Sequence, residues 1–141
     1  MQTKPILTIG AVIIKDGNIL LVKHTDSAGH QTGIYGLPAG KVDPGEEPKE
    51  ACQREIWEEV GLTVELKDME RLPHPYVAEI EMKYGKRMFC WIVYKVHRFT
   101  GEIRPTEKEI PEWVALESLF TMNNLLTNVL DAVKDAREIN I

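Results

Sequence analysis

The chain lacks the features that mark secreted, membrane and nucleic-acid-binding proteins. It has only two cysteines, Cys52 and Cys90, without C-x-x-C spacing, so a disulfide framework or a zinc site is not expected. The formal net charge is −5, which gives no basic surface for long nucleic acid. The apolar N-terminal stretch is interrupted by Pro5 and Gly10, lacks a cleavage site and is too short to span a bilayer. We expect a cytoplasmic protein without a membrane partner.

The composition is sufficient for one folded domain. Of 141 residues, 43% are hydrophobic, which is enough for a real core. There are no internal repeats, low-complexity runs or linkers. We therefore expect a single domain over residues 1–141.

Apolar runs and turn residues predict most of the strands. Residues 6–14 and 19–23 flank an Asp-Gly-Asn turn and predict a hairpin, and residues 24–35 a loop. Residues 76–84 and 88–96 predict a second hairpin whose return strand is central and buried. Further short strands are predicted at 37–39, 62–66 and 112–116.

Two helices are predicted. The first runs over residues 48–60 and ends at Gly61, a suitable residue for the position after a helix. The second runs from about 123 to 139, because apolar residues recur at helical spacing from Leu125 to Ala136, as expected for core packing. This order of elements predicts an α+β fold or a mixed-sheet sandwich.

Residues 40–62 carry the strongest chemical signal; they read GKVDPGEEPKEACQREIWEEVGL. On a helix, Glu55, Glu58 and Glu59 lie at i, i+3 and i+4, so their carboxylates share one face and repel one another. A divalent cation would offset that repulsion. Ligands that are all oxygen suit Mg²⁺, Mn²⁺ or Ca²⁺ rather than zinc.

This segment resembles the Nudix hydrolase signature, G-x5-E-x7-R-E-U-x-E-E-x-G-U, in which U is apolar. The fixed positions are all filled, by Gly40, Glu46, Arg54, Glu55, Ile56, Glu58, Glu59, Gly61 and Leu62. The resemblance implies a Nudix α/β/α sandwich with a mixed central sheet and two main helices. It also implies a Nudix pyrophosphohydrolase that depends on Mg²⁺, with Mn²⁺ as a substitute.

The resemblance assigns roles within the motif. Glu55, Glu58 and Glu59 would bind the metal together with the main-chain carbonyl of Gly40, and Glu58 or Glu59 would also orient the attacking water. Arg54 would position the motif's carboxylates rather than bind phosphate. Two interpretations of Glu46 stay open, a metal contact and a structural residue at the helix entrance.

The family often supplies a general base from a loop ahead of a late strand. Glu107 and Glu109 occupy a similar context here, and we favour Glu109 as the base or as a further metal ligand. The four histidines show no metal spacing and are expected in loops or on the surface: His24, His30, His74 and His97.

The substrate is less well defined by the sequence. In MutT-like members, an asparagine near the start of the last helix reads the purine edge. Asn124, with Asn123 beside it, fits that spacing. The alternative is that the asparagine is a helix N-cap.

We expect a nucleoside triphosphate, including oxidised forms such as 8-oxo-dGTP, to yield nucleoside monophosphate and pyrophosphate. The alternatives are an ADP-ribose or nucleotide-sugar pyrophosphatase and, more remotely, a non-catalytic nucleotide-sensing module. Family members are often dimers, so a homodimer is a further expectation.

Overall fold

The structure is a computed structural model that describes residues 4–25 and 32–138. Its first two strands, β1 (Ile6–Lys15) and β2 (Asn18–His24), form the predicted antiparallel hairpin. Asp16 and Gly17 make the turn, and both have the positive φ that tight hairpin turns require.

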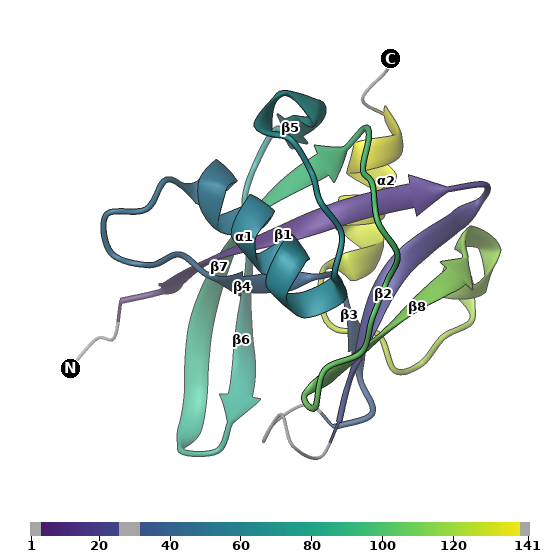
Figure 1. Ribbon diagram of the computed structural model, residues 1–141. Coiled ribbons are helices and arrows are strands. Elements are labelled where there is room, and N and C mark those ends of the chain that lie inside the picture. Colours follow the sequence, from purple (N-terminus) through teal and green to yellow (C-terminus); the bar gives the residue numbers. More distant parts are fainter. Residues whose placement is uncertain (1–3, 26–31, 139–141) are drawn as a thin grey trace.

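Within the described residues, eight strands form one mixed sheet (Figure 1). Its centre is β1 and the long strand β7 (Gly85–Val96), which run parallel to each other. Strand β1 also pairs antiparallel with β4 (Ala39–Lys41), and this pairing places Gly40 opposite Ile9. The remaining strands pair with β2 or β7: β3 (Tyr35–Gly36) and β8 (Glu109–Ala115) with β2, and β5 (Met69–Arg71) and β6 (Tyr76–Met82) with β7.

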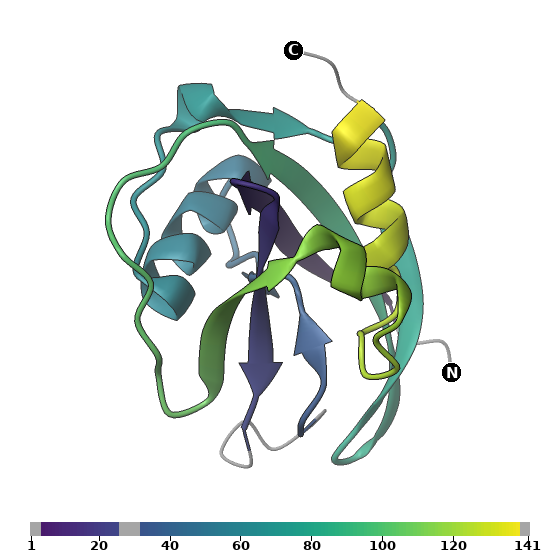
Figure 2. The same ribbon diagram turned by 90° about the vertical axis from the view of Figure 1, so that its right-hand side faces the viewer.

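One helix covers each face of this sheet (Figure 2). Helix α1 (Pro48–Val60) packs mainly against β1 and β4, and helix α2 (Val129–Glu138) against β1 and β7. There are also two short 3-10 helices. One, η2 (Leu66–Asp68), directly precedes β5, and the other, η3 (Leu116–Phe120), directly follows β8. The predicted α/β/α sandwich is confirmed. None of the helices in the described segments is long and apolar enough to cross a membrane.

Helix α1 has the limits that the sequence predicts. Pro48 occupies the first turn, where its missing N–H costs no hydrogen bond. Gly61 ends the helix with φ of 87°, and its N–H donates to the carbonyls of Ile56 and Trp57. The apolar residues Ala51, Cys52, Ile56 and Val60 are buried and form the face of the helix that packs against the sheet.

The last helix begins later than predicted. Asn128 has φ of 76°, a left-handed conformation that interrupts a helix, so α2 starts at Val129 instead of near residue 123. Leu125 instead forms an isolated bridge with Tyr35, and the N–H of Leu126 donates to the Tyr35 carbonyl. Both leucines still pack against the core beside α2. The apolar periodicity therefore indicated burial correctly, but the helix prediction before residue 129 was wrong.

Smaller boundaries also differ. No strand occupies the predicted range 62–66; there Thr63 forms only an isolated bridge with Thr100. The strand predicted at 112–116 begins earlier, at Glu109, because it pairs along the whole of β2. In the predicted loop 24–35, His24 still belongs to β2, and residues 26–31, including His30, lie outside the described residues.

Candidate active site

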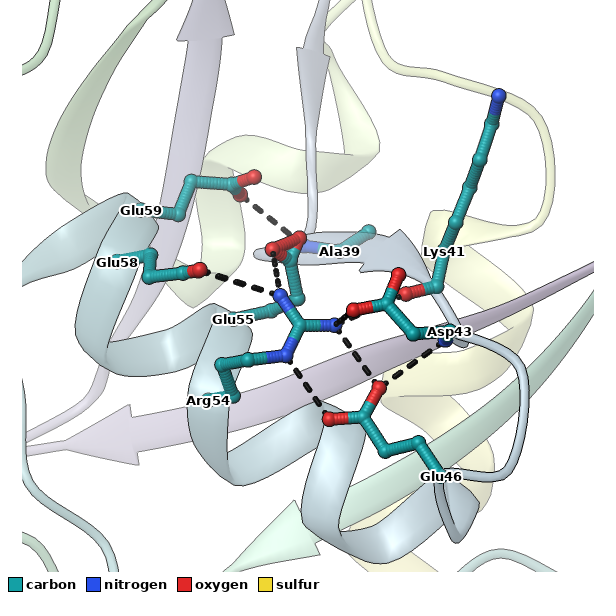
Figure 3. A network of polar contacts seen from close by, with 8 residues as sticks. All are labelled: Ala39, Lys41, Asp43, Glu46, Arg54, Glu55, Glu58 and Glu59. Carbon is teal, nitrogen blue, oxygen red and sulfur yellow. Dashed lines mark hydrogen bonds and ion pairs between the residues drawn. The ribbon is translucent and has the colours of Figure 1, made fainter.

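Arg54 lies at the centre of a polar network on α1 (Figure 3). Its guanidinium binds Glu46 with two parallel hydrogen bonds, Nε to Oε2 at 2.9 Å and Nη2 to Oε1 at 3.0 Å. Nη2 also donates to the main-chain carbonyl of Lys41 at 3.2 Å, and Asp43 Oδ2 lies 3.5 Å from the same nitrogen. Arg54 therefore ties α1 to the segment that leads into it.

The same guanidinium reaches two of the predicted metal ligands. Its Nη1 donates to Glu55 Oε1 at 3.1 Å and lies 3.2 Å from both oxygens of Glu58. Arg54 thus contacts carboxylates that we expect it to position, and a single cation reduces the repulsion between neighbouring acids on this helix.

The charges in this network favour a structural role for Glu46. Hydrogen bonds from Arg54, and then from the N–H of Asp43, lower the pKa of Glu46 below its usual value. Glu46 in turn is the main cause that raises the pKa of Arg54. Both oxygens of Glu46 are occupied by these donors, which makes a metal contact by the same carboxylate less favourable.

Gly40 provides the space in which the Glu55 carboxylate lies. A Cβ atom placed on Gly40 would stand 1.7 Å from Glu55 Oε2 and 2.2 Å from its carboxyl carbon. No side chain can be accommodated there without moving Glu55. The glycine of the motif is therefore required by close approach of the backbone to the carboxylate, and its φ lies outside the left-handed region.

The Glu59 carboxylate is buried and has acidic neighbours, with no cation among the groups that shift its pKa. Its Oε1 accepts a hydrogen bond from the N–H of Ala39 at 3.0 Å, which fixes the carboxylate beside β4. Burial raises the pKa of Glu59 well above its usual value, and the charges of Glu109 and Glu55 add to this rise. Burial also raises the pKa of Glu55, although Arg54 opposes that change.

Glu109 approaches the motif from a distant part of the chain. It is the first residue of β8, not a loop residue as expected, and it lies opposite His24 of β2. Its Oε1 accepts a hydrogen bond from Thr106 Oγ1 at 3.3 Å. Glu107 lies in the preceding loop, where its carbonyl accepts a hydrogen bond from Thr25 Oγ1.

A cleft of about 270 Å³ joins these acidic residues to an apolar wall. Its acidic lining residues are Glu59 and Glu109, and Gly40 and Lys41 also line it. Much of its apolar lining comes from the hairpin of β6 and β7. The lining residues are Thr8, His24, Leu37, Ala39, Gly40, Lys41, Glu59, Ile80, Met82, Phe89, Trp91, Glu109 and Leu126.

Several cleft residues were not predicted from the sequence. Phe89 and Trp91 are two residues apart on β7, so alternation along a strand places them on one face, but nothing local indicates which face meets the motif. His24 was expected to be a loop or surface residue and instead ends a strand inside the cleft. His74 and His97 are surface residues as expected, with their imidazoles near Asp135 and Glu70.

The asparagines of the predicted base contact lie on a connecting segment. Asn124 Nδ2 donates to the carbonyl of Gly33 at 3.0 Å, and the Asn124 carbonyl accepts the N–H of Tyr35. The N-cap alternative was wrong, because α2 begins only at Val129. Leu126, which follows in the same segment, lines the cleft. Asn123 and Asn124 are not among the described residues that line it.

The acidic residues suit a hard divalent cation by their chemistry. Across residues 4–25 and 32–138, no three His, Cys, Asp or Glu side chains already converge as a metal site. Glu58 accepts hydrogen bonds from Arg54, and Glu59 accepts one from the N–H of Ala39. However, the available donors are all oxygen, and the backbone of Gly40 lies against the Glu55 carboxylate. Burial raises the pKa of both Glu55 and Glu59, and neighbouring carboxylates add to the rise. A cation would relieve that mutual repulsion.

Comparison with known proteins shows the family of this chain. The NUDIX domain family matches residues 4–138. A MutT NUDIX hydrolase from Burkholderia pseudomallei superposes with a TM-score of 0.76 at 34% identity, over 94% of this chain and 98% of the other. A MutT protein from Methanosarcina mazei Go1 gives a TM-score of 0.80 at 26% identity, over 97% and 96%.

Two named relatives are also similar over most of their length. A CTP pyrophosphohydrolase of Escherichia coli (strain K12) is 28% identical over 114 residues, which cover 81% of this chain and 78% of the relative. The phosphatase NudJ of the same strain is 25% identical over 124 residues, or 86% and 76% of the two chains.

The sandwich of this chain matches that of MutT NUDIX hydrolases. The chain belongs to the Nudix family and is a Nudix hydrolase. Enzymes of this family generally use divalent metal ions and act on small nucleotide-like substrates.

Proposed function

We propose that this protein is a Mg²⁺-dependent pyrophosphohydrolase that cleaves nucleoside triphosphates to nucleoside monophosphate and pyrophosphate. The observation that carries the proposal is the position of Glu59 and Glu109 in one cleft, next to Gly40. Burial, and then the charge of Glu109, raise the pKa of Glu59, which supports a site for cationic and phosphorylated groups rather than a solvated helix surface. The similarity to a CTP pyrophosphohydrolase supports the same substrate class.

We assign Glu55, Glu58, Glu59 and the carbonyl of Gly40 to Mg²⁺, with Glu109 as a further ligand and Mn²⁺ as a substitute. A bound Mg²⁺ would neutralise the phosphate oxygens and orient a water molecule. In hydrolysis, the water oxygen forms a new bond to phosphorus while the bond from phosphorus to the bridging oxygen breaks. A carboxylate of the cleft, Glu59 or Glu109, accepts the proton of the water.

Arg54 would contribute to the same reaction without touching the substrate. It fixes Glu55 and Glu58 by hydrogen bonds and leaves Glu46 as its own counter-ion. Such fixed positions reduce the reorganisation needed when charge develops in the transition state. We therefore treat Arg54 and Glu46 as positioning residues.

A panel of substrates tests the proposal. The purified protein with Mg²⁺ is given canonical and oxidised nucleoside triphosphates, ADP-ribose, nucleotide sugars and diadenosine polyphosphates, and products are identified by chromatography. Release of pyrophosphate and nucleoside monophosphate from triphosphates is expected. A preference for ADP-ribose or a nucleotide sugar would overturn the substrate assignment and keep the acidic site. Tight nucleotide binding in calorimetry without turnover would indicate a sensing module instead.

Further properties complete the proposal. We assign the activity to a single domain in the cytoplasm, where the two free cysteines, Cys52 and Cys90, would stay reduced. A homodimer remains a prediction, which light scattering of the purified protein would test.

A further inference from the structure

The Glu109 carboxylate has a single hydrogen-bond donor within the described residues, the hydroxyl of Thr106. The distance from Thr106 Oγ1 to Glu109 Oε1 is 3.3 Å. The carboxylates of α1 are held by Arg54 and by the N–H of Ala39, and neither of these groups donates to Glu109. The orientation of the Glu109 side chain therefore depends on a residue outside α1 and its motif.

The same hydroxyl organises the turn that leads into β8. Thr106 Oγ1 accepts the N–H of Lys108 at 3.3 Å and the N–H of Glu109 at 3.1 Å. The N–H of Thr106 donates to the Glu109 carbonyl at 2.9 Å and closes the turn. In the sequence, Thr106 and Glu109 have the T-x-x-E spacing of a capping box, in which a hydroxyl binds the N–H three residues later. Here a strand follows instead of a helix, so these contacts fix the first residue of β8.

The hydrogen of the Thr106 hydroxyl has two acceptors within reach, the Glu109 carboxylate and the Glu109 carbonyl, which lies at 3.4 Å. The carboxylate is the stronger acceptor because it carries a negative charge, and the carbonyl already accepts the N–H of Thr106. Without this hydrogen bond, the neighbouring charges of Glu55 and Glu59 would repel the Glu109 carboxylate toward solvent.

We propose that Thr106 is a positioning residue, whose hydroxyl holds the Glu109 carboxylate in the cleft in the orientation that a divalent cation needs. The inference rests on the proposed function, because it takes Glu109 as a metal ligand of that site. The hydroxyl contacts neither cation nor substrate. It restricts a flexible side chain to one orientation before the cation binds, as residues that orient metal ligands do.

Removal of the hydroxyl tests this role in the protein without substrate. In Thr106→Val, which keeps the size of the side chain, the Kd for Mn²⁺ measured by electron paramagnetic resonance rises about 10- to 100-fold. Thr106→Ser restores the hydroxyl and returns the Kd to near the wild-type value. With Mg²⁺ and a nucleoside triphosphate, kcat of Thr106→Val falls by a similar factor and KM changes little. Thermal unfolding shows whether each variant is folded, and Thr106→Ala is measured in parallel so that a folding defect of one variant does not decide the outcome.

Thr25→Val is the matched control, because Thr25 binds the same turn without touching the carboxylate. Its hydroxyl donates to the Glu107 carbonyl, and its N–H donates to the Lys108 carbonyl at 2.9 Å. The substitution removes the first contact and leaves the second, so the Kd for Mn²⁺ and kcat stay near the wild-type values. An equal loss in Thr25→Val and Thr106→Val would mean that the turn matters and the hydrogen bond to the carboxylate does not, which overturns the proposal.

A double-mutant cycle shows whether Thr106 acts through Glu109. If it does, Thr106→Val has no further effect on the Kd for Mn²⁺ in a Glu109→Ala background. A further loss in that background would overturn the proposal, since the hydroxyl would then act on another part of the site.

The same variants separate this inference from the proposed function. Wild-type Mn²⁺ affinity and kcat in Glu109→Ala would remove Glu109 from the proposed function, and the role of Thr106 with it. A loss in Glu109→Ala together with wild-type behaviour of Thr106→Val would overturn the role of Thr106 alone. Preference for a substrate other than a triphosphate would overturn the substrate assignment alone, because Mn²⁺ binding is measured without substrate.

Discussion

Two groups of carboxylates around α1 differ in how their charge is balanced. The arginine cluster consists of Arg54 with Asp43, Glu46 and Glu58, and there each acid lies within 3.5 Å of the guanidinium. The cleft pair consists of Glu59 and Glu109, and for Glu59 no cation is among the causes that shift its pKa.

The shifts of pKa express this difference. Glu46 has a lowered pKa because Arg54 and a main-chain N–H bind its ionised form. Glu59 has a raised pKa because burial and neighbouring acids disfavour its ionised form. A carboxylate whose charge the protein itself satisfies contributes to stability, whereas one left unsatisfied in a cleft is available to a cation or a substrate.

The largest expected effect comes from the cleft pair. Glu59→Gln keeps the shape of the side chain and removes its charge, so kcat for the preferred triphosphate falls by about 10³-fold or more. The free energy of unfolding without metal does not fall, because a poorly compensated charge has been removed. Steady-state kinetics and urea unfolding measure the two effects.

Glu50→Gln, on the exposed first turn of the same helix, is the control and leaves both kcat and the free energy of unfolding unchanged. Near-normal turnover by Glu59→Gln would remove this residue from the mechanism.

The next largest effect on kcat is expected at Gly40, where the backbone lies against the Glu55 carboxylate. In Gly40→Ala, the new Cβ displaces the Glu55 carboxylate, and a shift of about 1 Å at a catalytic group can lower kcat about 10²-fold. Gly10→Ala is the control, since its Cβ meets neighbouring atoms only at 3.7 Å or more. Equal activity of the two variants would mean that Glu55 tolerates displacement.

The arginine cluster is expected to affect stability more than chemistry. Arg54→Ala removes the hydrogen bonds to Glu46, Glu55 and Glu58, so the free energy of unfolding falls by about 1–2 kcal/mol, a range that allows for partial exposure of the guanidinium. Arg54→Lys keeps the charge but not the paired geometry, and it recovers only part of this loss. Denaturant unfolding measures both variants, with Lys134→Ala on the exposed side of α2 as the control. A loss no greater than that of Lys134→Ala would show that the cluster is not stabilising.

The smallest effect is the pH dependence of the same cluster. The pKa of Glu46 is lower in the folded state than its ordinary value of 4.5, so its contribution to stability is present above about pH 4.5. That contribution is lost as the pH falls through the lower folded-state pKa. The difference in unfolding free energy between wild type and Glu46→Gln should therefore shrink between pH 6 and pH 3, a range chosen to span this change. A difference that stays constant over this range would contradict the pairing of Glu46 with Arg54.

Local sequence was a good guide wherever neighbouring residues decide the structure. The first hairpin, helix α1 and its end at Gly61 follow from turn residues, helix-compatible spacing and a single glycine. The start of α2 could not be predicted in the same way, because the periodicity of Leu125 and Leu126 continues across the break at Asn128. The side chain of Asn128 donates to the Val77 carbonyl, a contact that local sequence does not reveal.

The sequence by itself determined the chemistry of the motif. The spacing of Glu55, Glu58 and Glu59 is a property of one helix, and it holds in any fold that keeps that helix. Only the tertiary structure decided what faces those acids. Glu109 reaches the cleft through its register with His24, and Trp91 through its register with Thr8 and Tyr76. The packing of the whole sheet sets such registers, and a shift by one residue would turn each side chain to the opposite face.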